Sequence, residues 1–474
     1  MSAERESSGG LVRGLNAWDA TLLMMGSVIG GGIFLTPGDV AKALPVPGWI
    51  LAVWVAGGIL TLAGSLVYAE LGAMLPETGG TYLYLREAYG ALPGFLYAWV
   101  YYFVYNAGGV AAIATGFAKY AGAFFPALAM NREVFRVLGQ PISSGQLLAA
   151  GTVLFLSATH YVGVKEGARL QGVFTALIVL VMLGMILGGA VSSAPVPAHL
   201  GEPAPAGQAL EGVKSGAPPA ITLAAFGVAM VAVLWSFDGW NQIAAVAGEV
   251  KRPQRNVPLA LVLGTGIVTA LYVGMNAIYL KAIPALELAG VERPAEVAAL
   301  RLFGAGATWV IVGAILFAGF GCTSANIAPG ARVSYALAAD GLFPRPFARV
   351  HPRFRTPSFG LVVQAVWAAL LCLSGRYDQL YTYSMFIGVL AFAAAGVALF
   401  VFRRTRPDAP RPYRCWGYPV VPALFVVGSL LFLANTLVSQ PRESLAGLAI
   451  LALGVPVYFG MRRAQARRRM LSAR

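Results

Sequence analysis

The sequence predicts an all-α membrane protein with twelve transmembrane helices, and three observations support this fold class. Hydrophobic residues make up 58% of the 474 residues and charged residues only 11%, too few to cover a soluble protein of this size. Apolar stretches of about 20 residues, the length that crosses a hydrocarbon core, recur along the whole chain. The segments between them are short and polar or rich in Arg, and they leave no room for a soluble domain.

Twelve spans can be placed from these apolar stretches. The segment 1–15 is expected to be a short cytoplasmic tail, because it is polar and no cleavage site of a signal peptide follows it. Segment 194–218, rich in Pro, Ala and Gly, is expected to be an extracytoplasmic linker. The spans are predicted near residues 16–38, 47–72, 92–120, 145–162, 168–193, 219–246, 257–281, 306–338, 358–375, 379–402, 418–438 and 443–461.

The net charge of +14 is distributed unevenly between the two sides of the predicted membrane. With the N-terminus inside, most Lys and Arg residues fall in inner segments, above all in 403–414 and in the basic tail 462–474. By the positive-inside rule, both termini then lie in the cytoplasm and the protein lies in the cell (inner) membrane. The charge is explained without a nucleic acid partner, and the basic tail is expected to contact anionic lipid of the bilayer.

The cysteines and histidines indicate neither a disulfide-linked partner subunit nor a cofactor. Cys322 and Cys372 fall inside predicted spans and Cys415 in an inner loop, so none is placed for an outer disulfide. The three histidines fall in different regions, and none belongs to a His-Glu-x-x-His motif. A membrane-embedded enzyme is therefore a remote alternative.

Two predicted spans are interrupted at mid-membrane depth. The first contains Gly30-Gly31-Gly32, and the sixth contains Trp235-Ser236-Phe237-Asp238-Gly239. Glycine costs about 1 kcal/mol in a helix interior, so three in succession predict an unwound turn. Unwound backbone is tolerated at this depth only where it lines a protein-enclosed cavity, and matching interruptions in two halves of a chain indicate a transporter binding site. The alternative for Gly26 and Gly30 is a helix-packing face of small residues.

The spacing of the two interruptions predicts an inverted repeat. The sixth span comes five spans after the first, and because five is odd the second half must run through the membrane in the opposite direction. The first repeat is expected at 16–193 and the second at 219–402, and 403–461 adds two further spans.

These motifs and their order resemble those of the amino acid–polyamine–organocation transporters, and within them the L-type amino acid transporter branch. The resemblance covers nearly the whole chain and implies a LeuT-type five-plus-five inverted repeat, with helices 1 and 6 broken and two extra C-terminal helices. It also implies transport of amino acids. The matching motifs are the glycine-rich segment Gly26–Phe34 with Pro37, Tyr68–Gly72, Gly79–Tyr82, Gly239-Trp240-Asn241, Gly248-Glu249, Arg255–Pro258, Arg332 with Asp340–Pro344, and Tyr413 with Gly417-Tyr418-Pro419.

Broken helices offer donors and acceptors to a zwitterionic amino acid. The start of the second half-helix exposes amides, and the helix dipole there favours the carboxylate. Carbonyls at the break can accept from the ammonium. The apolar lining favours neutral over cationic substrates. The amides of Gly30, Gly31 and Gly32 are expected to bind the carboxylate. Carbonyls near Val28 and those of Trp235 and Ser236 are expected to bind the ammonium. The resemblance implies that these positions, with Ser27, contact the substrate.

Four side chains are candidates for substrate contact, each with an alternative. Trp235, which resembles an outer gate, and Phe237 are expected beside the substrate, or else in ordinary packing. Asn106 in the third span would bond the substrate or tie two helices together. Asp238 is the only acid deep within a span, and could bind a proton, contact a cationic substrate or cap the restarting half of the sixth span. The cap is favoured, because no basic partner is expected at that depth.

The sequence is compatible with more than one coupling ion. The resemblance implies a Lys in the fifth span whose ammonium takes the place of sodium, but Ile178 occupies that position. Thr323 and Ser324 resemble Na+ ligands, and carbonyls near Gly26 and Ile29 would complete an oxygen shell. The alternative is that both hydroxyls bond back to helix carbonyls. Exchange, Na+ symport and H+ symport are all compatible with this pattern, as is transport of another small amine such as a polyamine.

An inner gate of ion pairs is also expected. Glu70 and Glu249 fall at the cytoplasmic ends of the second and sixth spans, and Arg332 falls on the same side together with Arg169, Arg252 and Arg255. Such pairs can break and re-form as one repeat moves against the other. The alternative is a solvated cytoplasmic face.

Overall fold

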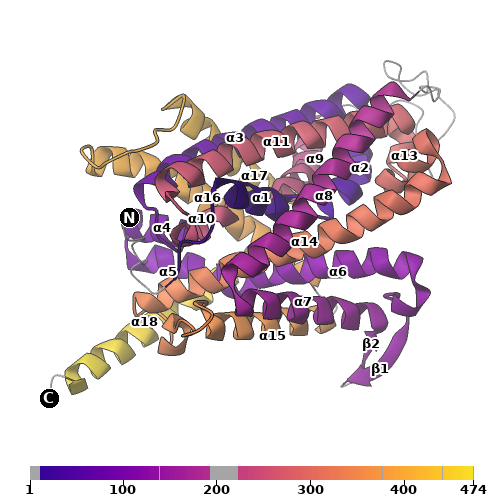
Figure 1. Ribbon diagram of the computed structural model, residues 1–474. Coiled ribbons are helices and arrows are strands. Elements are labelled where there is room, and N and C mark those ends of the chain that lie inside the picture. Colours follow the sequence, from indigo (N-terminus) through magenta and orange to yellow (C-terminus); the bar gives the residue numbers. More distant parts are fainter. Residues whose placement is uncertain (1–10, 138, 193–221, 375–376, 440, 473–474) are drawn as a thin grey trace, which may run out of the picture.

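The computed structural model describes residues 11–137, 139–192, 222–374, 377–439 and 441–472, and Figure 1 shows them as an elongated bundle of helices. Within these residues, seven helices are long and apolar enough to cross a membrane, or eight if one bent pair counts as a single span. The chain is therefore a multi-pass membrane protein. The whole of the expected linker 194–218 and residues 1–10 of the expected tail lie outside the described residues.

Helices cover every stretch in which the sequence predicts a span. In the first half of the chain the elements are α1 (Ala17–Val28), α2 (Gly32–Ala43), α3 (Pro47–Met74), α4 (Thr81–Tyr89), α5 (Ala91–Val100), the π-helical η1 (Tyr101–Asn106), α6 (Ala107–Phe124), η2 (Pro126–Leu128), β1 (Glu133–Val137), β2 (Gln140–Ser143), α7 (Ser144–Val162) and α8 (Val164–Val191).

The second half contains the same kind of elements. They are α9 (Leu223–Phe237), α10 (Gln242–Ala245), η3 (Ala247–Glu249), α11 (Pro253–Ala282), α12 (Ala285–Leu288), α13 (Pro294–Phe303), α14 (Ala305–Ala339), η4 (Arg345–Ala348), α15 (Ser358–Ser374), α16 (Tyr377–Thr405), α17 (Val420–Ser439) and α18 (Pro441–Ser472). The short helices α4, α12 and α13 are absent from the sequence prediction, since they are too short to give a span signal.

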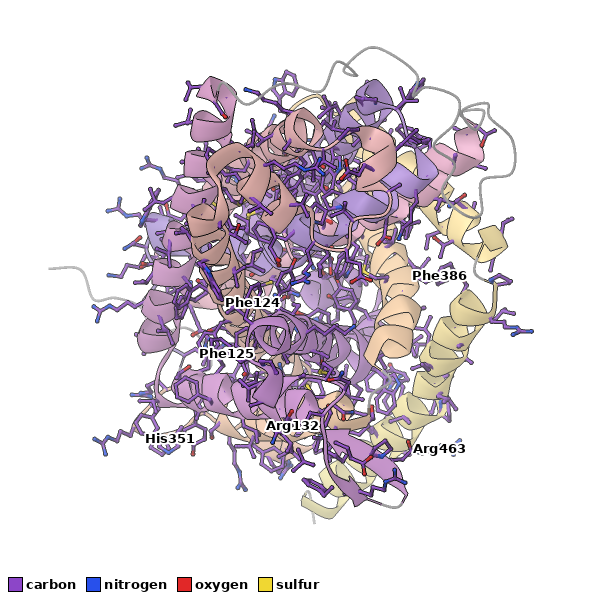
Figure 2. All side chains as sticks on the ribbon, turned by 90° about the vertical axis from the view of Figure 1, so that its right-hand side faces the viewer. Phe124, Phe125, Arg132, His351, Phe386 and Arg463 are labelled. Carbon is purple, nitrogen blue, oxygen red and sulfur yellow. The ribbon has the colours of Figure 1, made fainter. Side chains whose placement is uncertain are left out.

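A β hairpin follows α6, also unpredicted. Strands β1 and β2 pair antiparallel, and Gly139 takes a positive φ of 81° in the turn between them. Ser143 ends the hairpin and caps α7: its hydroxyl accepts from the amide of Gln146, whose side chain accepts from the amide of Ser143. Figure 2 looks onto this end of the bundle, with Arg132 labelled beside the hairpin.

The core of the bundle depends on small residues where long helices meet. A Cβ on Gly58 of α3 would lie 2.2 Å from Cγ2 of Thr269 on α11, so only glycine allows this approach. The hydroxyls of Ser65 and Thr265 join the same two helices by a buried hydrogen bond of 2.7 Å. The described ends of the chain lie at one end of the bundle, and α13 and the hairpin lie at the other (Figure 1).

Candidate functional site

The predicted break in the first span is present as a sharp turn between α1 and α2. The two helices meet at 42° across residues 29–31. Ile29 has φ −74° and ψ 87°, close to an inverse γ-turn, and the amide of Gly30 donates to the carbonyl of Val28 at 2.9 Å. Gly32 already belongs to α2, so the unwound stretch is shorter than the three glycines suggested.

One of the three amides expected to bind a substrate carboxylate already has an acceptor in this turn. The amide of Gly30 is used within the turn, because it donates to Val28. Among the described residues, no acceptor bonds to the amides of Gly31, Gly32 and Ile33. These three amides open α2, where the helix dipole favours an anion. Among the described residues, Gly31 and Gly32 of the expected donors therefore have amides without an acceptor, and Ile33 adds a third.

The break in the sixth span lies directly against the break in the first. Helix α9 ends at Phe237, Asp238 is extended, and Gly239 takes a φ of 100° before the short helix α10. A Cβ on Gly239 would lie 2.3 Å from the carbonyl oxygen of Ser27. A Cβ on Gly32 would likewise lie 2.9 Å from Cα of Ser236. Glycine on each break therefore allows the two backbones to touch.

Two of the three carbonyls expected to bind the ammonium already have donors. The carbonyl of Val28 accepts from the amide of Gly30 and from the hydroxyl of Tyr272 at 3.0 Å. The carbonyl of Trp235 accepts from the amide of Asp238 at 3.1 Å. The carbonyl of Ser236 has no donor among the residues that the structure describes. Of the three expected acceptors, the carbonyl oxygen of Ser236 is thus the one that can still accept hydrogen bonds with both lone pairs.

A cavity lined by residues of both breaks lies where they meet. The expected substrate residues on its wall are Ser27, Val28, Gly30, Gly31, Gly32, Asn106, Trp235, Ser236 and Asp238. The other wall residues, which the sequence did not indicate, are Tyr105, Gly109, Ala112, Ile113, Gln242, Cys322 and Asn326.

Two of the expected substrate neighbours are engaged in packing or in helix contacts. Phe237 is absent from the cavity wall: its side chain is 1% exposed, and its ring centroid lies 5.0 Å from that of Tyr272. Asn106 lies on the wall, but its amide donates to the carbonyl of Asn326 at 2.9 Å and its oxygen accepts from Gln364 at 2.9 Å. Asn106 therefore ties η1 to α14 and α15.

Asp238 does not cap the restarting helix, contrary to the favoured expectation. The N-cap of α10 is Asn241, and α10 has no side-chain cap. The carboxylate of Asp238 accepts from the hydroxyl of Tyr105 at 2.5 Å and from the backbone amide of Gly239, which precedes α10. One turn earlier, the hydroxyl of Tyr101 donates to Gln242 at the start of α10. Both phenols belong to η1, and both hydrogen bonds run from this π-helical segment to the break in the sixth span. π-helical turns are frequent at functional sites.

The residues expected at a cation site are divided among other partners. The hydroxyl of Thr323 donates to the carbonyl of Gly319 at 2.7 Å, as in the alternative weighed from the sequence. The hydroxyl of Ser324 lies 3.0 Å from Nε2 of the buried His160. Gly26 faces α8, and Ile29 occupies the γ-turn.

Glu249 and Arg332 form a fully buried ion pair. Nε of Arg332 lies 2.7 Å from Oε1 of Glu249, and Nη2 lies 3.2 Å from Oε2. Both side chains are 0% exposed, which excludes a solvated face for these two residues. Such a bidentate pair is stable in the interior only while both partners are present.

Glu70 is also buried, but its partners differ from the arginines named from the sequence. Its carboxylate pairs with Arg403 at 2.7 Å and with Arg411 at 3.3 Å, and it accepts from the amide of Cys415 at 2.6 Å. These residues belong to the end of α16 and to the segment before α17. Glu70 therefore fastens this segment to α3, a contact that sequence spacing cannot reveal. Burial raises the pKa of the Cys415 thiol to about 12.

The segment before α1 closes over the same end of the molecule. The amide of Leu15 donates to the carbonyl of Glu249 at 3.0 Å, and the amide of Lys251 donates to the carbonyl of Leu15 at 2.7 Å. Leu11 and Leu15 are both buried. Glu249 thus holds Arg332 with its side chain and the N-terminal segment with its backbone.

The sequence is similar to a known protein family. A family model described as amino acid permease matches residues 15–461. The chain is 30% identical over 466 residues to the serine/threonine exchanger SteT of Bacillus subtilis (strain 168). The alignment covers 96% of this chain and 98% of that protein.

Two human proteins are similar over nearly as much of the chain. The b(0,+)-type amino acid transporter 1 is 28% identical over 452 residues, 95% of this chain and 87% of that protein. The large neutral amino acids transporter small subunit 2 is 30% identical over 462 residues, 97% of this chain and 82% of that protein. All three relatives are named as exchangers or transporters of amino acids.

Proposed function

The chain belongs to the amino acid permease family, and we propose that it is a secondary active transporter that moves neutral L-amino acids across the cell membrane by alternating access. As in its relatives, its function is transport and not enzymatic catalysis. The observation that carries the proposal is the cavity at which the two broken helices meet. Its wall offers backbone donors on one side and a backbone acceptor on the other.

The substrate carboxylate is proposed to bind the amides of Gly31, Gly32 and Ile33 at the start of α2. These amides lack acceptors among the described residues, and an anion there gains from the helix dipole. The ammonium is proposed to bind the carbonyl of Ser236, which needs a donor. Both groups are common to all amino acids, so side chains of the cavity must decide between substrates.

A neutral substrate is favoured by the composition of the wall. Among the described residues that line it, Asp238 is the only one with a carboxylate, and the hydroxyl of Tyr105 already donates to that carboxylate. Val28, Ala112 and Ile113 supply apolar surface for a substrate side chain. A polyamine has several ammonium groups and would need more than this one carboxylate, so it is the weaker proposal.

The inner gate is proposed to be the pair Glu249–Arg332 with the N-terminal segment over it. Both close the end of the molecule at which the described chain begins. Opening on that side would have to separate Arg332 from Glu249. It would also have to separate Leu15 from the backbone of Glu249 and Lys251. Glu70 is proposed to act differently, by holding the segment before α17 to α3.

The proposed topology keeps twelve spans with both termini in the cytoplasm of an inner membrane. The repeats would be 16–193 and 219–402, so that α1 and α9 are the equivalent broken helices. The described ends of the chain lie at the same end of the bundle, which supports an even number of spans (Figure 1). The spans would be α1 with α2, α3, α5 with η1 and α6, α7, α8, α9 with α10, α11, α14, α15, α16, α17 and α18.

The proposal is tested by thermal unfolding of the purified protein in detergent with each of the twenty L-amino acids. A substrate that binds the folded state raises the midpoint of unfolding, and the rise grows with the logarithm of its concentration once that exceeds Kd. The amide of the stabilising amino acid is the control, because it keeps the side chain and ammonium but lacks the carboxylate. Equal stabilisation by the amide would contradict the assignment of the α2 amides.

A further inference from the structure

A second cleft lies at the end of the molecule at which the described chain begins, where Figure 1 shows α4. Its wall comes from the segment before α1, the loop between α3 and α4, helix α4 itself and the C-terminal end of α14. It shares no described wall residue with the cavity at the two breaks. The side chains that define this inner cleft are Leu11, Arg13, Glu77, Thr78, Arg86 and Asp340.

The inner cleft lies directly beside the proposed inner gate. Gly248, which precedes Glu249 of the buried ion pair, lines the cleft, and a Cβ on it would lie 2.3 Å from Oγ1 of Thr78. The segment before α1 bonds to the backbone of Glu249 through Leu15, and its residue Arg13 lines the cleft. An amino acid that enters from the cytoplasm would therefore meet the inner cleft before it passes the gate.

The segment before α1 turns Arg13 toward the inside of the molecule. Leu11 and Leu15, two residues to either side of Arg13, are each 1% exposed, whereas Val12 is 49% exposed. This alternation is that of an extended chain, in which side chains two residues apart lie on the same side. Nε of Arg13 is buried and has no hydrogen-bond partner among the described residues. A buried donor without an acceptor is costly, so this guanidinium favours a bound anionic group.

The wall of the inner cleft carries two arginines and two acids, and one residue of each kind is already paired. Asp340 accepts from Arg86 and from the hydroxyl of Tyr82. Arg13 and Glu77 have no ion-pair partner in the part of the chain that the structure describes, and they are not paired with each other. The inner cleft thus offers one free guanidinium and one free carboxylate.

This balance of charge favours a zwitterion over a simple ion. An anion at Arg13 would be repelled by the acids of the wall, and a cation at Glu77 by the arginines. An amino acid carries both charges, and its carboxylate matches the fork of a guanidinium.

We propose that the inner cleft is a cytoplasmic binding site for the transported amino acid, in which Arg13 binds the carboxylate and Glu77 the ammonium. The inference rests on the proposed transport function and adds a second substrate site on the cytoplasmic side of the gate. Such a site holds the amino acid next to the gate and so lowers the KM for transport from the cytoplasm.

The test is uptake of labelled amino acid by membrane vesicles of defined orientation, loaded with a saturating concentration of the same unlabelled amino acid. The amino acid is the one that raises the midpoint of unfolding most. Inside-out vesicles take it up through the cytoplasmic face, and right-side-out vesicles through the outer face. Arg13→Gln and Glu77→Gln are each expected to raise KM about fivefold in inside-out vesicles, the effect of one partly exposed ion pair. Their KM in right-side-out vesicles is expected to stay that of the wild type.

Two further variants separate binding from a loss of surface charge. Arg345→Gln is the matched control, because Arg345 is an exposed arginine outside the inner cleft, and its KM is expected to be unchanged at both faces. The exchange of charges in Arg13→Glu with Glu77→Arg is expected to recover much of the KM that Arg13→Glu alone loses. A zwitterion can bind the exchanged pair in the opposite orientation.

Three results would overturn the inference. The first is an unchanged KM of both neutral variants in inside-out vesicles. The second is an equal change at both faces, or a lower maximal rate at unchanged KM, which would indicate a role in gating or stability. The third is an exchange of charges that adds to the loss. Absence of exchange by the wild type in both kinds of vesicle, with every amino acid, would instead refute the transport function itself.

Discussion

The hydroxyl of Tyr105 donates to the carboxylate of Asp238 at 2.5 Å and so joins a π-helical turn of one span to the break in another. Both residues lie on the wall of the cavity in which the substrate is proposed to bind. The phenol thereby fixes the carboxylate on the cavity wall, and its hydrogen bond offsets the cost of an acid at this depth.

Removing this phenol is the first prediction. Tyr105→Phe removes the side-chain donor to the carboxylate of Asp238 and is expected to raise KM for exchange by about tenfold, as for one hydrogen bond to a charged group. Tyr120→Phe is the matched control, because the buried hydroxyl of Tyr120 has no partner among the described residues. Equal KM values for the two variants would contradict a role of the Tyr105 hydroxyl in the site.

The glycines at the first break make a second prediction. Gly32→Ala places a Cβ 2.9 Å from the backbone of Ser236 and is expected to abolish exchange, because neither backbone can move without opening the site. Gly31→Ala meets only Leu35 at 3.5 Å and is expected to keep measurable exchange. Initial rates at saturating substrate compare them, and equal loss in both variants would show that the close approach of the breaks is not what matters.

The buried ion pair makes a third prediction. Arg332→Met leaves the carboxylate of Glu249 buried without a partner and is expected to lower the free energy of unfolding by about 3–5 kcal/mol. The double variant Arg332→Met with Glu249→Leu removes both charges and is expected to recover most of that loss. Thermal unfolding in detergent measures both. A double variant as unstable as the single one would contradict the pairing.

The segment held by Glu70 makes a fourth prediction. Burial raises the pKa of the Cys415 thiol to about 12, so at pH 7 it is almost wholly protonated and is expected to react slowly with a maleimide. Glu70→Ala releases Arg403 and the amide of Cys415, and is expected to speed labelling of Cys415 by exposing the thiol. Labelling is followed by mass spectrometry, with Cys372 as the buried internal reference. An unchanged rate at Cys415 would show that Glu70 does not hold the segment.

Hydropathy and glycine spacing were sufficient to place helices and both breaks. The span expected at 306–338, for example, is α14, Ala305–Ala339. The cavity wall contains most of the residues named from the two breaks, because an unwound segment in a membrane must face a protein-enclosed space.

Local conformation and tertiary contacts account for what the sequence missed. The γ-turn at Ile29 consumes the amide of Gly30, and no spacing of glycines predicts it. Tyr105 donates to Asp238 from a π-helical turn. Such a turn rotates the side chains away from the directions that regular α-helical spacing would give them. The partners of Glu70 lie more than three hundred residues away in the chain, so only the fold brings them together.

The most direct test of the account is counterflow by the wild type and by Gly32→Ala in matched proteoliposomes. The wild type is expected to accumulate a labelled neutral L-amino acid saturably, and only when unlabelled amino acid is trapped inside. Gly32→Ala of equal thermal stability is expected to accumulate none. Wild-type uptake that neither saturates nor depends on trapped substrate would contradict a carrier, and full counterflow by Gly32→Ala would contradict a site at the two breaks.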